Sequence, residues 1–113
     1  MTLSDMIRDY CRRTKAKHTP EEIAFIASKN HVIASEDGFV VFSWVLDEFH
    51  CLFAYAAPGR KFAPINAMLE AYARENGIKR IKFSTDRPEV MGRLFRGYRP
   101  IATILCKEVE YDG

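Results

Sequence analysis

Two neighbouring segments of this chain are apolar at most positions, and they constrain its fold more than any other feature. The segments are Phe39–Leu46 and Phe49–Ala57, and only Asp47 and Glu48 separate them. Successive side chains of a strand point to opposite faces of a sheet. A strand that is apolar on both faces is therefore covered on both faces. We expect these segments to be paired central strands in a sheet flanked by helices.

Further strands are predicted on either side of this pair. His31–Ser35 precedes Glu36-Asp37-Gly38, a turn signal that predicts a hairpin with the first apolar segment. Lys79–Thr85 alternates charged with apolar residues, as a half-buried strand does. Ile101–Val109 is predicted as a final strand.

Four helices are predicted from apolar residues at helical spacing. Thr19, Pro20 and Glu22 mark the start of the second helix, because they combine a capping box with proline at the first helical position. Gly77 ends the third helix, since glycine adopts the left-handed conformation that closes a helix. The expected helices are Leu3–Lys15, one from Thr19 to about Ala27, Ile65–Asn76 and Pro88–Phe95.

This order of elements predicts a single α/β (α+β) domain over residues 1–113. Two helices precede three strands, and a helix, a strand, a helix and a strand follow. The helix Ile65–Asn76 connects two strands as a crossover, so we expect those two strands to run parallel in a mixed sheet. The chain is long enough to bury a core without disulfides or metals, which domains below roughly 70–80 residues often need.

Composition narrows the class of protein. Hydrophobic residues make up 48% of the chain, as in a globular protein. No apolar run approaches the roughly 20 residues that cross a bilayer, and the acidic start MTLSDMIRDY is unlike a signal peptide. Cys11, Cys51 and Cys106 form no close pair, which argues against a disulfide framework. We expect a cytoplasmic protein without a membrane partner.

Charge is distributed unevenly along the chain although the net charge is only +2. Arg60–Arg99 contains ten basic and four acidic residues, whereas Glu36–Glu48 contains four acidic residues and no lysine or arginine. This asymmetry suits an anionic ligand near the basic segment. A solvated surface of mixed charge would give the same pattern.

The element order and the local sequence after Asp47 resemble the GNAT superfamily of N-acetyltransferases. The best-matching stretch is Ile65–Ile81, which contains the family phrase A-R-x-x-G-I-K-x-I from Ala73 to Ile81. Gly97-Tyr98 lies where the family usually has Gly-Phe. The resemblance covers roughly the last two-thirds of the chain. It implies a GNAT-like fold whose cofactor-binding half is Asp47–Glu110, with acetyl-CoA as the cofactor.

The resemblance also implies that one edge of the sheet is open. A GNAT domain usually begins with a strand, whereas here a helix is expected within about three residues of Met1. We therefore expect the family's first strand to be missing. Exposed edges are commonly protected or used for pairing, so a partner protein or a homo-oligomer is expected to cover this one.

The loop before the long helix departs from the family. In GNAT enzymes it reads Arg/Gln-x-x-Gly-x-Gly/Ala, and its backbone N–H groups bind the pyrophosphate of CoA. Here Ala63 and Ile65 replace the glycines, and Pro64 has no N–H to donate. A short basic turn at a helix start would have the same sequence. If the cofactor binds, the resemblance implies contacts from Phe53, Ala54, Tyr55, Arg60, Lys61, Phe62 and Ala63.

The catalytic groups of the family are also poorly matched. Many GNAT enzymes use a tyrosine as general acid, and Arg93 occupies that place here. Glu48 and His50 are the candidates for a general base, and a histidine titrates near neutral pH. A lone histidine on an apolar strand is more often a core residue. The histidines have no metal-ligand spacing, so no metal is expected.

Three functions follow from these observations. The favoured one is a non-catalytic structural, assembly or interaction module, because the chain loosely resembles the short GNAT-shaped proteins of tailed-phage virions and head assembly. Such a protein would reside in a virion. The alternative is an acetyl-CoA-dependent N-acetyltransferase that acts on an amine. The third is binding of nucleic acid by the basic segment, whose interleaved aromatics Phe62, Tyr72, Phe83, Phe95 and Tyr98 fall mostly at core-facing spacing.

Overall fold

The computed structural model describes residues 1–15, 17–84, 97–99, 101 and 105–109. Three helices and four strands lie in these residues. In chain order they are α1 (Leu3–Thr14), α2 (Pro20–Ser28), β1 (His31–Ser35), β2 (Gly38–Val45), β3 (Glu48–Ala56), α3 (Ala63–Glu75) and β4 (Arg80–Phe83).

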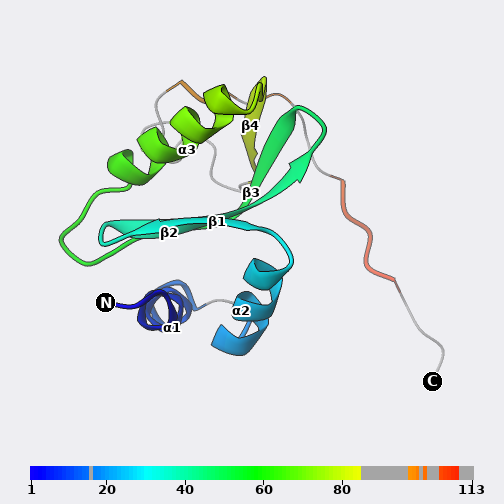
Figure 1. The fold of residues 1–113 in the computed structure, drawn as a ribbon. Helices are drawn as coiled ribbons and strands as arrows, with labels where there is room; N and C mark the ends of the chain where they lie inside the picture. Colours follow the sequence, from blue (N-terminus) through cyan, green and yellow to red (C-terminus); the bar gives the residue numbers. More distant parts are fainter. Residues whose placement is uncertain (16, 85–96, 100, 102–104, 110–113) are drawn as a thin grey trace.

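The four strands form one mixed sheet in the order β1-β2-β3-β4. β1, β2 and β3 are antiparallel, and β3 pairs with β4 in parallel. Helices α1 and α2 cover one face of the sheet and α3 covers the other (Figure 1). The expected α+β class, the central position of the two apolar strands and the parallel pair are thus confirmed.

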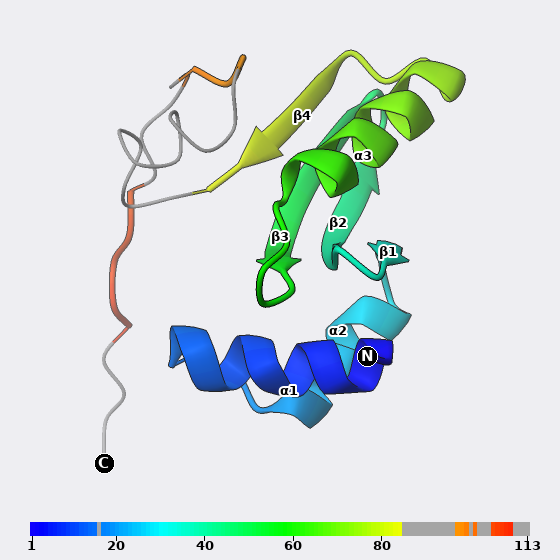
Figure 2. The ribbon, with the colours of Figure 1, turned by 90° about the vertical axis from the view of Figure 1, so that its left-hand side faces the viewer.

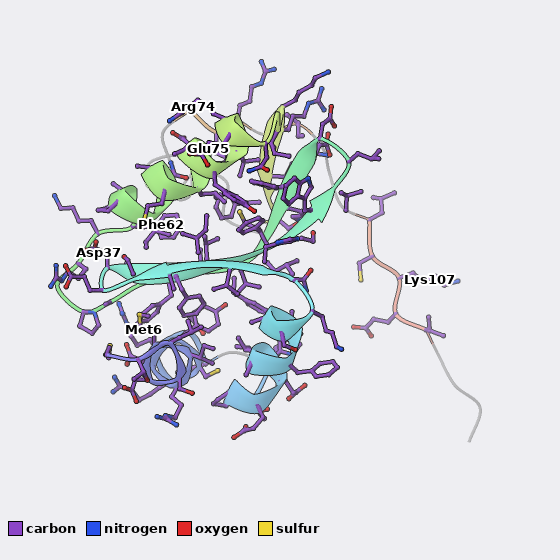
Figure 3. The ribbon with its side chains drawn as sticks, in the orientation of Figure 1. Met6, Asp37, Phe62, Arg74, Glu75 and Lys107 are labelled. Atoms are coloured by element: carbon purple, nitrogen blue, oxygen red, sulfur yellow. The ribbon has the colours of Figure 1, made fainter. Side chains whose placement is uncertain are left out.

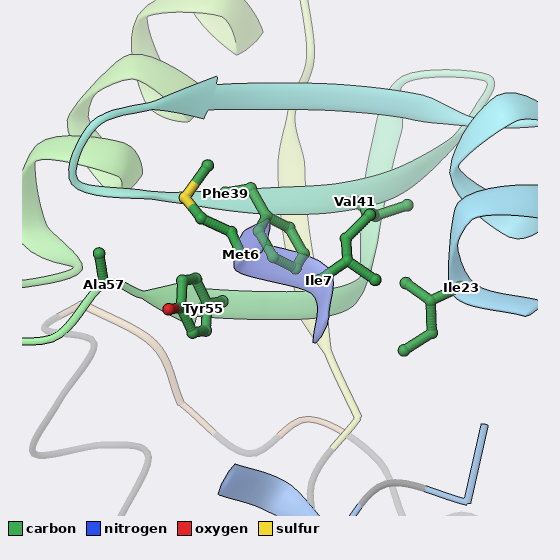
Figure 4. Close-up of a cluster of buried hydrophobic side chains, with 7 residues drawn as sticks. All are labelled: Met6, Ile7, Ile23, Phe39, Val41, Tyr55 and Ala57. Carbon is green, nitrogen blue, oxygen red and sulfur yellow. The ribbon is translucent and has the colours of Figure 1, made fainter. Parts of the chain in front are cut away.

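Two hydrophobic cores lie on the two faces of the sheet. Along β2, Phe39 and Val41 pack under α1 and α2, whereas Val40 and Phe42 pack under α3. All four side chains are fully buried. Figure 4 shows the core beneath α1 and α2, which combines residues of both helices with residues of β2 and β3: Met6, Ile7, Ile23, Phe39, Val41, Tyr55 and Ala57.

A β-bulge in β3 changes which face its side chains occupy. Val41 pairs with Phe53 and Phe42 pairs with Cys51, so Leu52 has no partner on β2. An extra residue of this kind bends its strand and locally disrupts the ladder. Cys51 accordingly joins the α3 core, and Phe53, two residues later, packs toward α1 and α2. The pairing of β3 with β4 also ends at Cys51.

The helix ends largely follow the sequence signals. Thr2 with Asp5, and Thr19 with Glu22, form capping boxes at the starts of α1 and α2. Gly77 adopts a φ of 68° after α3, and the N–H of the next residue bonds to the carbonyl of Ala73 at 2.9 Å. At its other end α3 has no side-chain cap.

Three expectations differ from the structure. α3 begins at Ala63 rather than Ile65, so Ala63 and Pro64 lie in its first turn instead of in the preceding loop. The turn between β2 and β3 is Leu46-Asp47 rather than Asp47-Glu48, because Glu48 already pairs with Val45. The final strand is wrong for the residues that the structure describes: Ile101 and residues 105–109 are not in a strand. The expected helix Pro88–Phe95 and residues 102–104 lie outside the described residues.

Gly38 gives a direct test of how closely β2 and β3 approach. It has a φ of 151°, and a Cβ placed on it would lie 1.9 Å from the carbonyl oxygen of Tyr55. We predict that Gly38→Ala lowers the free energy of unfolding by about 3 kcal/mol, at the upper end for overpacking. Urea denaturation monitored by circular dichroism measures this.

Gly59 is the matched control. Its φ is 74°, but nothing lies within 4 Å of the place that a Cβ on this residue would occupy. Gly59→Ala should therefore cost only the left-handed backbone penalty, about 1 kcal/mol. Equal losses in the two variants would contradict the steric explanation.

Candidate functional site

The predicted cofactor-binding residues gather where β3 ends and the chain turns into α3. Phe53, Ala54 and Tyr55 lie on β3 beyond the bulge, and Arg60–Ala63 lead into the helix. Figure 2 shows this loop beside the strand, and Figure 3 shows Phe62 and Asp37 at the same end of the sheet. The fold therefore brings together the residues that the sequence grouped.

The side chain of Tyr55 points into the core beneath α1. Its hydroxyl donates a 2.6 Å hydrogen bond to Oδ2 of Asp9, and both residues are buried. Asp9 also accepts a hydrogen bond from Arg12, and Arg13 Nη1 lies 3.6 Å from its Oδ2. Arg13 in turn donates to the carbonyl of Ala56 at 3.0 Å. Tyr55 therefore fastens α1 to β3.

Ionisation of Asp9 is coupled to this contact. The hydrogen bond from Tyr55, followed by that from Arg12, lowers the pKa of Asp9. Burial and the neighbouring carboxylate raise the pKa of Tyr55, so its hydroxyl stays a donor. No local sequence pattern marks Asp9, because its partner lies 46 residues away.

Phe53 and Ala54 also use their side chains in the two cores. Phe53 meets the rings of Tyr10 and His18 edge-on, with centroids 5.8 and 5.9 Å away. Ala54 packs in the core beneath α3. What these residues can offer a ligand is backbone: in the described sheet, no strand pairs with residues 52–56 on the side of β4.

The loop residues divide into two kinds. Arg60 and Lys61 are exposed, and Arg60 Nη1 lies 3.4 Å from Asp37 and 3.7 Å from Glu36. Phe62 is half-buried against the core beneath α3, and Ile65 is fully buried in it. Ala63 is exposed at the first position of the helix, directly before Pro64.

Ion pairs join the acidic segment 36–48 to four of the basic residues that follow it, Arg60, Lys79, Arg80 and Lys82. All four acidic residues of segment 36–48 lie against basic residues of segment 60–82. Besides the two contacts of Arg60, the pairs are Asp47 with Lys79 at 3.7 Å, Glu48 with Lys82 at 2.7 Å and Glu48 with Arg80 at 3.8 Å. Exposed pairs contribute only about 0–1 kcal/mol each, but they offset the positive potential that an anion would meet.

The general-base candidates lie at the far end of β3. Glu48 begins the strand and accepts the ion pairs with Lys82 and Arg80. His50 is half-buried, with Nε2 3.0 Å from Oγ of Ser84. At a rise of about 3.3 Å per residue, roughly 25 Å of strand separates Glu48 from the loop.

The described aromatic residues of the basic segment pack within the fold. Tyr98 donates to Oδ1 of Asn66 at 3.2 Å, and burial raises its pKa. Phe62, Tyr72 and Phe83 are half-buried against the core beneath α3, as their spacing predicted. Arg93 and Phe95 lie outside the described residues.

Other kinds of site find little support in the part of the chain that the structure describes. It contains no group of three or more His, Cys, Asp or Glu side chains placed to hold a metal ion. None of its helices has both the length and the apolar character needed to cross a bilayer. Burial raises the pKa of the Cys51 thiol to about 12, so this cysteine is a poor nucleophile at neutral pH.

Comparison of the chain with protein-family models, with curated proteins and with solved structures finds no match.

The Tyr55–Asp9 contact predicts a specific dependence of stability on pH. The pKa of Asp9 is lower in the folded protein than in the unfolded chain, so the ionised carboxylate stabilises the folded state. This stabilisation is fully present above about pH 4 and is lost as the pH falls through the folded pKa. Tyr55→Phe removes the largest cause of that shift. The variant should be less stable than the parent at pH 7, and the gap should narrow below pH 4. Urea denaturation at pH 7 and pH 3 measures both gaps.

Tyr72→Phe is the matched control, because its hydroxyl belongs to a ring in the other core. Its effect on stability should not follow the titration of Asp9. A gap between Tyr55→Phe and the parent that stays constant from pH 7 to pH 3 would contradict the coupling.

Proposed function

We propose that this chain is a GNAT-shaped, non-catalytic interaction module whose contact surface includes the open edge of β1. One observation carries the proposal: the first turn of α3, where a GNAT enzyme would bind the pyrophosphate of acetyl-CoA, lacks the backbone donors and the open approach that an anion needs. Pro64 has no N–H, and Ile65 is fully buried in the core. The side chains of Tyr55 and Arg60 are also engaged within the fold, with Asp9 and with Glu36 and Asp37.

The GNAT-like shape is supported by the order and pairing of the elements. Two helices, three antiparallel strands, a helix and a parallel strand follow one another as the resemblance implies. The bulge at Leu52 and the end of the β3–β4 ladder at Cys51 agree with the splayed strands expected of that family.

The start of α3 is a poor anion site. A helix N-terminus binds phosphate through free backbone N–H groups that a ligand can approach closely. Pro64 removes one such donor from the first turn. Ile65 places a β-branched side chain in the core at the position of the second family glycine, so the backbone there is fixed by packing.

The edge of β1 supplies a surface for a partner strand. β1 is the first strand in the sheet order, so one of its sides has no neighbouring strand in the described sheet. Val32 and Ile33 are half-buried on the two faces and continue the two cores to this edge. An added strand could extend both cores, which is how extended segments commonly dock on sheet edges.

A particle-assembly role fits this proposal, as in the GNAT-shaped phage proteins that the chain loosely resembles. Location in a virion or in the cytoplasm follows from that role and is part of the proposal. The partner would be a protein, without a membrane or nucleic acid.

A second candidate function is acetyl-CoA-dependent N-acetylation of an amine. The observation that favours it is that residues 52–56 have no strand partner on the side of β4 in the described sheet, where backbone groups of Phe53, Ala54 and Tyr55 could bind pantetheine. Arg60 and Lys61 follow at the end of the strand, where phosphates would lie. Glu48 or His50 would then act as the base.

A thermal-shift assay separates the two functions. We predict that millimolar acetyl-CoA or CoA at low salt leaves the melting temperature unchanged. A ligand at a hundred times its dissociation constant would add about 2.7 kcal/mol, which raises Tm on the order of 10 °C in a domain of this size.

A double variant, Arg60→Ala with Lys61→Ala, controls for non-specific effects of a polyanion. An increase in Tm with acetyl-CoA that disappears in this variant would support the acetyltransferase and contradict a module without cofactor.

A further inference from the structure

We propose that residues 105–109 of one copy add as a strand to the outer edge of β1 in a second copy, which gives a strand-exchanged dimer. The inference rests on the proposed function, because it names the partner of the same edge.

The segment 105–109 has strand-like sequence but no strand partner in the structure. Its five residues are all exposed, with Leu105 at 91% and Val109 at 67%. It runs clear of the sheet in both views of the ribbon (Figures 1 and 2), and Lys107 marks it in Figure 3. Proline and glycine, which would weaken a strand, do not occur in it.

Burial of the exposed apolar side chains of this segment would favour its pairing with a sheet. Leu105 and Val109 would lie on one face of a strand, because residues four apart point the same way. Lys107 lies between them on that face, and its long stem can carry the ammonium group to solvent. Pairing with a sheet edge that borders one of the two cores would remove both apolar side chains from water.

β1 offers such an edge. A two-residue turn makes Ser35 and Gly38 a hydrogen-bonded pair, so the N–H and C=O groups of Val32 and Ala34 point away from β2. Five residues of β1 match the five of the segment in length. Native edges are usually protected by lysine, other charges or proline, and His31–Ser35 contains no Lys, Arg, Asp, Glu or Pro.

The opposite edge is less suited to an apolar strand. β4 has four residues, of which Arg80 and Lys82 carry positive charge. A second copy is favoured over the same chain because the segment projects away from its own sheet. In a dimer with two-fold symmetry, the segment 105–109 of each copy would pair with β1 of the other copy. Both β1 edges and both segments would then be occupied, so the assembly would not grow further.

Cys106 makes the pairing directly testable in the full chain. It is an exposed free thiol, whereas Cys11 is half-buried and Cys51 is buried. We would introduce Ala34→Cys, unfold equal amounts of 14N- and 15N-labelled protein together in urea, refold the mixture, and treat it with a short bis-maleimide. The expected result is a covalent dimer whose cross-linked peptides, joining position 34 to Cys106, include mixed-isotope pairs.

Two controls test whether the cross-link is specific to position 34 and Cys106. Met68→Cys places a thiol at an exposed position of α3 and should give no link to Cys106. Adding Cys106→Ser to the Ala34→Cys variant should abolish the cross-link. Links between position 34 and Cys106 that are never isotopically mixed would mean pairing within one chain, which overturns the inference.

Light scattering on unlabelled protein gives an independent readout. The parent chain should have twice the mass of one chain, and Leu105→Asp with Val109→Asp should halve it. Ala34→Pro, which removes an outward N–H, should do the same. Leu46→Asp, at an equally exposed residue of the β2–β3 turn, should leave the dimer intact. Circular dichroism confirms that each variant is folded.

The outcomes separate this inference from the proposed function. A dimer that Ala34→Pro abolishes but the double aspartate variant retains would overturn the exchange and keep β1 as the contact edge. A parent chain that is monomeric at every concentration, with no cross-link, would overturn the exchange. Binding of acetyl-CoA would contradict the proposed function whatever the oligomeric state.

Discussion

Burial of β2 on both faces is the constraint on which the rest of the structure depends. Phe39, Val40, Val41 and Phe42 are consecutive and fully buried, so helices must cover both sides of the sheet at this point. α1 and α2 supply one layer and α3 the other. β3 must lie beside β2 to complete both cores, and β1 and β4 are then the outer strands among the residues that the structure describes.

The bulge at Leu52 turns this two-sided sheet into two different halves. Before it, β3 pairs with both neighbours and contributes Phe49 and Cys51 to the α3 core. After it, Phe53 and Tyr55 face α1, and β4 no longer accompanies the strand. The same extra residue therefore precedes the part of β3 that has no partner on the β4 side in the described sheet, and it turns Tyr55 toward α1. The bulge at Leu52 therefore affects both the shape of the sheet and the attachment of α1 to it.

Much of this architecture follows from local sequence signals. The apolar runs predicted the central strands, and Thr19 and Glu22 predicted the start of α2, because these signals act over a few residues. The bulge gave no signal, since Leu52 continues an apolar run in which either register buries apolar side chains. The contacts of Asp9 with Tyr55 and of Glu48 with Lys82 join residues far apart in the chain, so spacing could not predict them. The prediction of the final strand was wrong for a related reason. The residue types of segment 105–109 favour an extended backbone, but a strand also requires a neighbouring strand to pair with.

The same distinction between local and long-range effects decides which loop deficit matters most for cofactor binding. The ion pairs of Arg60 with Glu36 and Asp37 are exposed, and pairs of that kind contribute only about 0–1 kcal/mol. A pyrophosphate could displace these carboxylates, so charge alone does not prevent binding. Pro64 and Ile65 are different, because a missing N–H cannot be restored by a side-chain movement and Ile65 is held by the core. Restoring an anion site would require the first turn of α3 to leave its packing against the sheet, which would expose the core that β2 and β3 require. Backbone and packing, the two properties that the buried sheet fixes most firmly, therefore oppose cofactor binding more strongly than charge does.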